Sequence, residues 1–551
     1  ILAENCYQCH GPDANARKAG LRLDQFAGAT RELASGVTAI IPGDPDASEL
    51  VARVESDDRS LLMPPPRSRK ALSPTQKQLL RQWIAEGANW QQHWSYQPLH
   101  RPAVPANQHS LWSSNPVDRF VLATLEQRSI LPSVPTDRAT LIRRLSLDLT
   151  GLPPTPEDAR AFLDARHSDA YPRLVDRLLA SPRFGERMAV WWLDLVRFAD
   201  TVGYHSDVDR SIALYRDYVI QSFNINRPFD RFAIEQLAGD LVPDSSDWQK
   251  VASAYTMLGM TTEEGGAQPK EYLAKYFADR VRNFGSVWMG ATLGCAECHD
   301  HKYDPYTQRD FYALGAFFAD LQQVGVGTPK PSLELPTREQ ADKKAKLNRR
   351  LKQISAAFEV ADPKEKGVLE NERNGLKQQL AQLDRTIRKT IIAISGPPRI
   401  TRVLSRGDWM DETGEIVEPA LPAFLNSLVS SPGRRPTRLD LANWVIAPDN
   451  PLTARVVVNR LWKLFFGAGL ADSLDDLGAQ GERPSHPELL DWLAVELRES
   501  GWDVKHLVRL IVLSTAYQES SAPRLDLASV DPLNRLRASQ SAFRLEAEFI
   551  R

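Results

Sequence analysis

All four cysteines of the chain fall in two copies of one five-residue pattern, C-x-x-C-H. This pattern is typical of c-type haem attachment. Two thiols about one helical turn apart can reach the two vinyl groups of one porphyrin, and the adjacent histidine can bind the iron. The sequence therefore predicts two haem c groups, each with a histidine as one axial ligand. The predicted attachment residues are Cys6, Cys9, Cys295 and Cys298, and the predicted iron-binding histidines are His10 and His299.

Zinc binding and dithiol redox chemistry are two other uses of cysteine pairs. Zinc usually takes four ligands, and Cys9 with its neighbour His10 would make an awkward chelate. A thioredoxin-like pair needs strands and helices that alternate around it, and the flanks of neither motif show that pattern. Four cysteines in 551 residues are also too few for a disulfide scaffold. Haem attachment is therefore the favoured interpretation of both motifs.

The charge balance argues against two classes of partner. Lys and Arg number 68 against 70 Asp and Glu, which leaves a net charge of -2. This balance gives no electrostatic reason to expect binding to nucleic acid or to an anionic membrane surface. No apolar run approaches the roughly 18 residues that would indicate a membrane span. The hydrophobic content of 42% is that of a globular chain.

Covalent haem implies a periplasmic or otherwise extracytoplasmic protein, because c-type attachment takes place outside the cytoplasm. The chain starts at Ile1, only five residues before Cys6, and shows no signal peptide. At the other end, residues 539–551 show a helical pattern without a stop signal. We therefore expect an exported protein without its leader, cut short at the C-terminal end.

Met63 differs from the other methionines because a run of prolines follows it. Proline disfavours helix in the preceding residue, so Met63 is expected in an extended loop. A thioether held in this way is suited to the sixth position of an iron, and His/Met ligation raises the reduction potential. Core filling is the other common use of methionine. We predict Met63 as the second axial ligand of the first haem.

The residues around these ligands resemble a known family. C-x-x-C-H near the start, P-G-D-P, M-P-P-P, and L-S-P-T-Q followed by L-L-R-Q-W-I-A-E-G-A-N-W are similar to the planctomycete-type cytochrome c domain. The last of these stretches also predicts a helix from Ser73 to Asn89, capped by Ser73 and with proline at its first position. The resemblance implies a small helical cytochrome fold over residues 1–92, with His10 and Met63 as axial ligands.

Residues 93–325 are predicted to form a larger helical domain that carries the second motif. A proline-rich linker from His93 to about Asn115 precedes helical patterns bounded by proline, glycine or aspartate. The stretches H-W-S-Y-Q-P, R-R-L-S-L-D-L-T-G-L-P-P-T-P, W-W-L-D-L-V-R-F-A-D-T and G-C-A-E-C-H-D-H-K-Y-D-P resemble a planctomycete domain of unknown function that accompanies the cytochrome domain. This resemblance supports the architecture more than any particular chemistry.

The sequence leaves the second axial ligand of the second haem open. The candidates are Met257, Met260, His205 and His93. A five-coordinate iron is the alternative, and its vacant position would permit small-ligand or peroxide chemistry. His301 and Asp304, which follow the motif closely, are candidates for contact with a haem propionate or for a separate metal site.

Two further segments complete a fold predicted to be mainly α. Residues 326–392 are charge-rich, with apolar residues at helical spacings and a break at Asp362-Pro363, and predict an antiparallel helical hairpin. Residues 393–551 are predicted to form a mostly helical C-terminal domain, with β-like character between residues 391 and 419. N-P-L-T-A-R-V-V-V-N-R-L-W, P-S-H-P-E-L-L-D-W-L-A and S-G-W-D-V-K-H-L-V-R-L-I resemble a second planctomycete domain of unknown function, here truncated.

These features favour an exported haem protein that transfers electrons to or from a redox partner that the sequence does not identify. A second hypothesis is a haem-dependent oxidoreductase acting in extracellular polysaccharide breakdown, a setting that the resemblance implies. A third is a scaffold that binds a surface polymer, for which some of the 13 tryptophans could line a glycan site. No catalytic residue is predicted.

Overall fold

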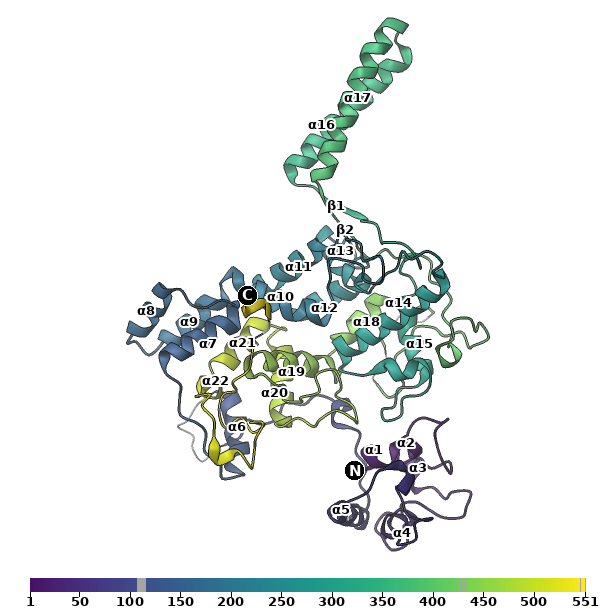
Figure 1. Cartoon of the computed structure of the whole chain (residues 1–551), viewed down its shortest axis with the longest axis vertical. Helices are drawn as coiled ribbons and strands as arrows, with labels where there is room; N and C mark the ends of the chain where they lie inside the picture. Colours follow the sequence, from purple (N-terminus) through teal and green to yellow (C-terminus); the bar gives the residue numbers. More distant parts are fainter. Residues whose placement is uncertain (107–114, 426–427, 430–432, 546, 551) are drawn as a thin grey trace.

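The computed structural model describes residues 1–106, 115–425, 428–429, 433–545 and 547–550. Residues 107–114 of the predicted linker lie outside the described residues, as does Arg551. The described chain is mainly helical, as predicted, and Figure 1 shows a small N-terminal domain, a large helical body and a long projecting arm. No helix among the described residues is long and apolar enough to cross a membrane.

The N-terminal domain packs short helices and long loops around a small core. Its helices are α1 (Leu2–Asn5), α2 (Tyr7–His10), α3 (Phe26–Thr30), α4 (Glu49–Glu55) and α5 (Pro74–Ala85). Helix α5 begins where predicted, because Ser73 Oγ accepts a hydrogen bond from the backbone of Gln76 (3.2 Å), whose side chain accepts one from the backbone of Ser73 (2.9 Å). The helix ends before Asn89, since Gly87 takes a positive φ of 96° and turns the chain.

The body consists of two runs of helices. The first run comprises α6 (Pro116–Glu126), α7 (Arg138–Thr150), α8 (Pro156–Asp164), α9 (Ala170–Leu179), α10 (Pro182–Leu195), α11 (Ala213–Asn224), α12 (Phe229–Ala238), α13 (Asp247–Ala252), α14 (Pro269–Phe284) and α15 (Gln308–Ala316). The second comprises α18 (Arg438–Val445), α19 (Thr453–Phe466), α20 (Pro487–Glu499), α21 (Val504–Val512), α22 (Thr515–Gln518) and α23 (Ala547–Ile550). Helix α23 covers only part of the helical pattern expected over residues 539–551.

The two runs share one hydrophobic core. Helix α12 packs on α18, α6 on α20 and α9 on α21. Trp192 and Trp288 from the first run and Trp462 from the second are each at most 1% exposed and belong to the same cluster. Burial of side chains of this size stabilises the fold by roughly 1.5–3 kcal/mol each. The segments that resemble two separate domains therefore form one packed body.

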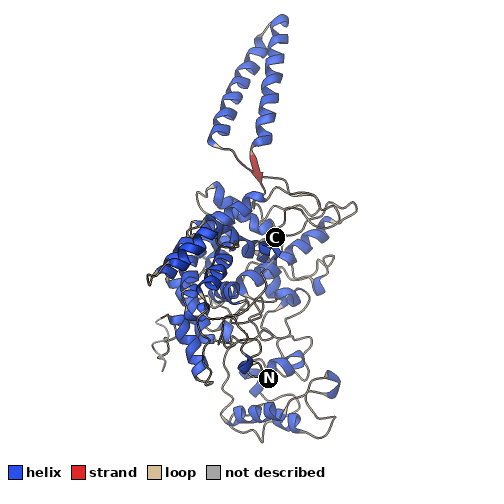
Figure 2. Ribbon diagram, turned by 60° about the vertical axis from the view of Figure 1, so that its left-hand side comes forward, coloured by secondary structure: helices blue, strands red, loops and turns tan. Residues whose placement is uncertain are grey.

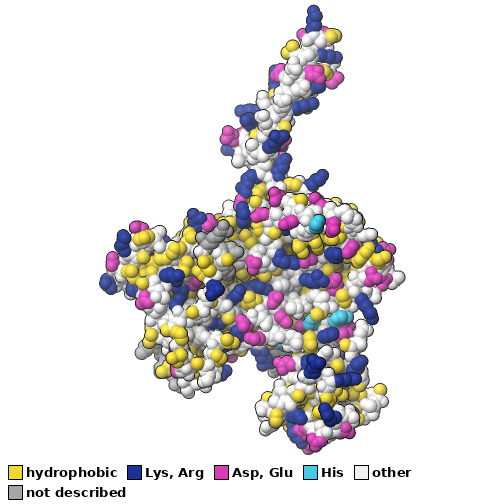
Figure 3. Space-filling view, in the orientation of Figure 1, with side chains coloured by type: hydrophobic (Ala, Val, Ile, Leu, Met, Phe, Trp, Pro, Cys, Tyr) yellow, Lys and Arg dark blue, Asp and Glu magenta, His cyan; other side chains and the backbone are white. Residues whose placement is uncertain are grey.

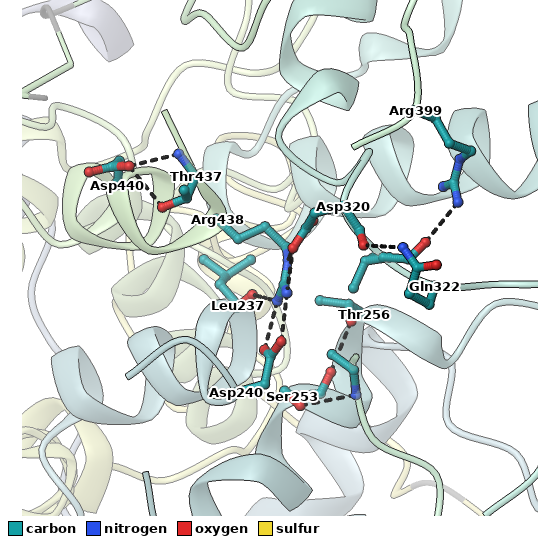
Figure 4. Close-up of polar contacts among 12 residues, drawn as sticks. Leu237, Asp240, Ser253, Thr256, Asp320, Gln322, Arg399, Thr437, Arg438 and Asp440 are labelled. Carbon is teal, nitrogen blue, oxygen red and sulfur yellow. Dashed lines mark hydrogen bonds and ion pairs between the residues drawn. The ribbon is translucent and has the colours of Figure 1, made fainter. Parts of the chain in front are cut away.

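A buried arginine also joins the two runs, as Figure 4 shows. Arg438, at the start of α18, is fully buried and binds the carboxylates of Asp240 and Asp320 at 2.7 and 2.9 Å. Its guanidinium also donates a hydrogen bond to the backbone oxygen of Leu237 (3.0 Å). Two carboxylates and a carbonyl thus accept from all three nitrogens of the guanidinium, which offsets the cost of taking these charges out of water.

The arm is the antiparallel helical hairpin that the sequence predicts. Helix α16 (Arg338–Val360) and helix α17 (Pro363–Thr386) lie side by side in Figure 2 and are held by buried Ile354, Leu376 and Leu383. Asp362 caps α17 by accepting from the backbone of Lys364 (2.8 Å), with Pro363 at the first helical position.

The two-stranded sheet lies at the base of the arm, just outside residues 391–419, where β-like character was predicted. Strands β1 (Leu333–Leu335) and β2 (Arg388–Thr390) pair antiparallel, with Leu335 opposite Arg388. Among the described residues, the segment 391–419 forms isolated β-bridges, such as the one between Arg402 and Ile416. The apolar side chains of Ile391 and Ala393 are buried in the body instead, 2% and 1% exposed, so they pack against helices and not within a sheet.

Candidate haem attachment sites

The first C-x-x-C-H motif forms one helical turn at the start of the N-terminal domain. The backbone nitrogens of Cys9 and His10 both donate to the backbone oxygen of Cys6, at 3.1 and 2.9 Å. This turn places the two thiols near one another, with the imidazole at the following position. Both cysteines are free, and Cys6 packs against the small core, where burial raises its thiol pKa to about 11.

His10 is suited to bind a metal as a neutral imidazole. Its side chain is half-buried, and burial lowers its pKa below the ordinary value. Its Nδ1 atom is buried and has no hydrogen-bond partner among the described residues. Met63, the predicted partner ligand, is half-buried, and its backbone nitrogen donates to Arg53 O at 2.9 Å. Met63 lies outside the cluster of side chains that forms the small core.

The second motif forms a 3-10 turn, Leu293–Glu297, between α14 and α15. Buried Leu293 and Ala296 anchor the turn, while Cys295 and Cys298 are free and exposed. The backbone nitrogens of Cys298 and His299 both approach the backbone oxygen of Cys295 at 3.4 Å. The two motifs therefore share the same local arrangement of two thiols followed by an imidazole.

The imidazole of His299 is oriented by its own backbone. Its Nδ1 lies 2.7 Å from the backbone oxygen of Asp300, to which it donates. That hydrogen bond fixes the tautomer and leaves the Nε2 lone pair available, which is the arrangement of metal-binding histidines in general. Two free thiols and an available imidazole are the donor set that a c-type haem requires, so the residues of both motifs fit this cofactor.

His301 and Asp304 bind protein groups. His301 is 4% exposed, and its Nδ1 accepts a hydrogen bond from the backbone of Asp304 (2.9 Å). Burial lowers its pKa to about 4. The Asp304 carboxylate accepts from the backbone of Ala479 (2.8 Å) and lies 3.4 Å from the hydroxyl of Tyr96. Within the described ranges, no group of three or more His, Cys, Asp or Glu side chains is arranged to hold a metal ion.

The flanks of the two motifs meet at the junction between the N-terminal domain and the body. A Cβ at Gly11, the residue after His10, would lie 2.7 Å from the backbone oxygen of Lys302, so the close approach depends on glycine. Asp13 Oδ2 lies 3.8 Å from His299 Nδ1.

The figures agree with this placement. Helices α1 and α2 lie on the side of the small domain that faces the body in Figure 1, and Figure 3 shows histidine side chains on the adjoining surface of the body. The sequence contains no signal for this meeting, because Gly11 and Asp13 read as an ordinary G-P-D turn and lie far from Lys302 along the chain.

The structure separates the four candidates for the second axial ligand of the second haem. Met257 is 5% exposed and belongs to the core of the body, whereas Met260 is 55% exposed. His205 lies exposed in a loop. His93 is half-buried, its Nδ1 lies 2.8 Å from Ser95 Oγ, and burial lowers its pKa to about 4.

Comparison with known families matches three parts of the chain. Residues 6–67 match the family described as Planctomycete cytochrome C (PSCyt1). Residues 116–323 match PSCyt2, described as a protein of unknown function (DUF1549), and this range includes the second motif. Residues 437–551 match PSD1, described as a protein of unknown function (DUF1553). Searches of the curated proteins and of the solved structures each found no match.

The small domain with its C-x-x-C-H turn is thus a cytochrome c domain, joined to a helical body. The chain contains a planctomycete cytochrome C domain followed by PSCyt2 and PSD1 domains, as the sequence predicted. The cytochrome C domain implies haem binding, and both cysteine pairs are consistent with haem attachment.

Proposed function

We propose that this protein is an exported c-type haem protein that transfers single electrons. One haem c is attached to Cys6 and Cys9, with His10 and Met63 as axial ligands. A second is attached to Cys295 and Cys298, with His299 as an axial ligand. The location is periplasmic or otherwise extracytoplasmic, which agrees with the presence of a cytochrome C domain.

Each bound haem would supply a ferrous/ferric couple that accepts and releases one electron. The chain contributes a binding site for each and a fixed relation between the two. His10 and His299 offer imidazole nitrogens to the iron, and the four thiols would hold the porphyrin edges. The position of Met63 outside the small core supports its use as a ligand in preference to core filling.

The observation that carries the proposal is the meeting of the two motifs at the junction. Gly11 lies against the backbone of Lys302, and Asp13 faces His299. Tyr7 lies between the two cysteines of the first motif. Burial raises the pKa of its hydroxyl, and the charges of Asp24, Cys6 and Asp304 raise it further; Asp304 belongs to the segment of the second motif. A short path between the two sites favours electron exchange within one chain. The external partners are then a one-electron donor and a one-electron acceptor, and a surface polysaccharide is a further candidate for association.

Haem content tests this proposal directly. The full-length protein, matured in a compartment that attaches c-type haem, should give two haems per chain in the pyridine haemochrome spectrum. The paired variant Cys295→Ala/Cys298→Ala should retain one haem, and so should Cys6→Ala/Cys9→Ala. A count of zero in the wild-type protein would refute electron transfer. A count of one would refute the second attachment site.

Electron exchange between the sites has its own measurement. After rapid mixing with less than one equivalent of a one-electron reductant, the electron should equilibrate between the two haems faster than it exchanges between molecules. A redistribution rate that rises in proportion to protein concentration would show exchange between molecules and contradict the proposed path.

A further inference from the structure

A loop formed by residues 401–417 lies against the second motif. Its two sides are joined by a backbone hydrogen bond from Val403 to Glu415 (2.9 Å). A Cβ at Gly407, near the tip, would lie 3.2 Å from the sulfur of Cys298. The backbone of the loop therefore packs directly beside the attachment residue.

Two side chains of α15 fasten this loop to the motif. Gln308 Nε2 donates to the backbone oxygens of Glu297 (3.0 Å) and Leu404 (2.8 Å). The hydroxyl of Tyr312 donates to the same backbone oxygen of Glu297 (3.0 Å) and lies 3.5 Å from the backbone oxygen of Leu404. One helix thus holds the loop and the motif in a fixed relation.

Met410 follows Gly407 by three residues in this loop. Farther along the loop, Glu412 pairs with Lys270 at the start of α14 (2.5 Å), the end of that helix away from the motif. Three residues of extended chain span at most about 10 Å. The backbone of Met410 therefore lies within about 10 Å of Gly407, the residue that packs against Cys298. Its backbone nitrogen donates to Asp408 Oδ1 (2.9 Å), which folds the tip of the loop.

The thioether of Met410 is free to bind a ligand. Met410 is 68% exposed, whereas Met188, Met257 and Met289 are at most 5% exposed in the core. Core filling is the usual role of methionine, and Met410 does not fill a core. Met260 is the other exposed methionine of the body, but a Cβ at Gly203 would lie 2.9 Å from its sulfur, so that thioether packs on a neighbouring loop.

The loop of His205 contacts the start of α14, whereas the second motif lies near the end of this helix. Tyr204, its neighbour, contacts Tyr272 near the start of the helix, with ring centroids 5.6 Å apart. The motif is tied to the end of the helix by the ion pair between Arg282 and Glu297. Ten residues of helix separate these two points, which corresponds to about 15 Å along the axis. The loop of His205 is thus held about 15 Å from the motif along this helix, whereas Met410 follows Gly407, which packs on Cys298, by three residues.

We propose that the sulfur of Met410 is the second axial ligand of the iron at the second motif, opposite His299. The inference rests on the second haem of the proposed function and deepens it. His/Met ligation at both sites gives two six-coordinate, low-spin irons with raised potentials. The second site then serves as an electron relay and not as a centre that binds small molecules.

The test uses the full-length holoprotein with Met410→Ala and, as the matched control, Met260→Ala. Pyridine haemochrome first establishes two haems per chain in all three proteins. The sulfur-to-iron charge-transfer absorption of the ferric protein is then measured per chain. We expect the band to fall by half in Met410→Ala and to keep its full intensity in Met260→Ala. Met410→His should restore a low-spin second haem without restoring the sulfur band.

The outcomes separate the two proposals. Two haems with an unchanged band in Met410→Ala, or a halved band in Met260→Ala, would overturn the ligand assignment and leave the dihaem function standing. A wild-type count of one haem would overturn the dihaem function itself. If Met410→Ala does not fold, a wild-type ferric spectrum with one high-spin haem would still overturn the assignment.

Discussion

Asp13 of the cytochrome c domain and His299 of the body face one another, with 3.8 Å between Oδ2 and Nδ1. Asp13 is only 5% exposed, and its other carboxylate oxygen accepts a hydrogen bond from the backbone of Asn15 (2.9 Å). His299 already donates through Nδ1 to Asp300 O. One domain thus places a fixed, buried negative charge beside the proposed iron ligand of the other.

This relationship predicts the effect of Asp13→Asn on the reduction potential. A nearby negative charge stabilises ferric over ferrous iron, and at protein dielectric a single charge at this range contributes on the order of 1–2 kcal/mol. We expect Asp13→Asn to raise the potential of the second haem by tens of millivolts, measured by spectroelectrochemistry. Asp46→Asn, on the exposed surface of the same domain, should leave both potentials unchanged. A shift of the first haem alone would contradict the role assigned to Asp13.

Met63→Leu should lower the potential of the first haem. Leucine keeps the volume of the side chain but removes the sulfur, so the substitution tests ligation separately from packing. Loss of the thioether removes the contribution of His/Met ligation to a raised potential. A redox titration resolves the two haems, and the second should keep its potential. An unchanged first potential would eliminate Met63 as a ligand.

Arg438→Ala should strongly destabilise the body. The substitution leaves the carboxylates of Asp240 and Asp320 buried without their counter-charge, which typically costs about 3–5 kcal/mol. The expected result is a lower midpoint of urea unfolding, followed by far-UV circular dichroism. Arg81→Ala removes an exposed pair with Asp46 and should change stability by less than about 1 kcal/mol. Equal effects of the two substitutions would contradict the joining role of Arg438.

Glu519 makes the stability of the body depend on pH. It is fully buried, both carboxylate oxygens lack hydrogen-bond partners among the described residues, and burial raises its pKa from 4.5 to about 9. Between these two values the folded chain keeps a proton that the unfolded chain releases. Stability from this group is therefore present below pH 4.5 and is lost as the pH rises through about 9.

Glu519→Gln should remove this dependence. We expect the variant to gain stability relative to the wild-type protein at pH 8 and to gain little at pH 4, as measured by urea midpoints at both values. Exposed Glu488→Gln on α20 is the control and should shift neither midpoint appreciably. A gain of the same size at both pH values would show that the effect of Glu519→Gln does not arise from its proton.

Local signals predicted most of the helices. Ser73-Pro74 and Asp362-Pro363 mark helix starts because a capping side chain and a proline act on the nearest turn only. The two C-x-x-C-H motifs likewise identified both candidate sites, because the chemistry depends on residues within one turn.

Contacts between distant segments had no such signal. The approach of Gly11 to Lys302 and the pairing of Arg438 with Asp240 depend on how the whole chain packs, and nothing in a short stretch of sequence encodes them. The packing of the loop that carries Met410 had no such signal either, since it follows from the hydrogen bond that Gln308 of α15 donates to Leu404. The paired strands lie just outside the segment predicted to be β-like, because buried apolar residues such as Ile391 have the same pattern whether they face a sheet or a helix.

The two ends of the arm join the body at the same place. Leu335 and Arg388 are direct partners in the strand pair, so the chain leaves and returns to the body at one point. Residues 336–387 can therefore be excised and replaced by a two-residue hairpin turn without moving either end of the body. The arm is then a module that can be removed or used as a site for insertion, while both C-x-x-C-H motifs remain on the part that is kept.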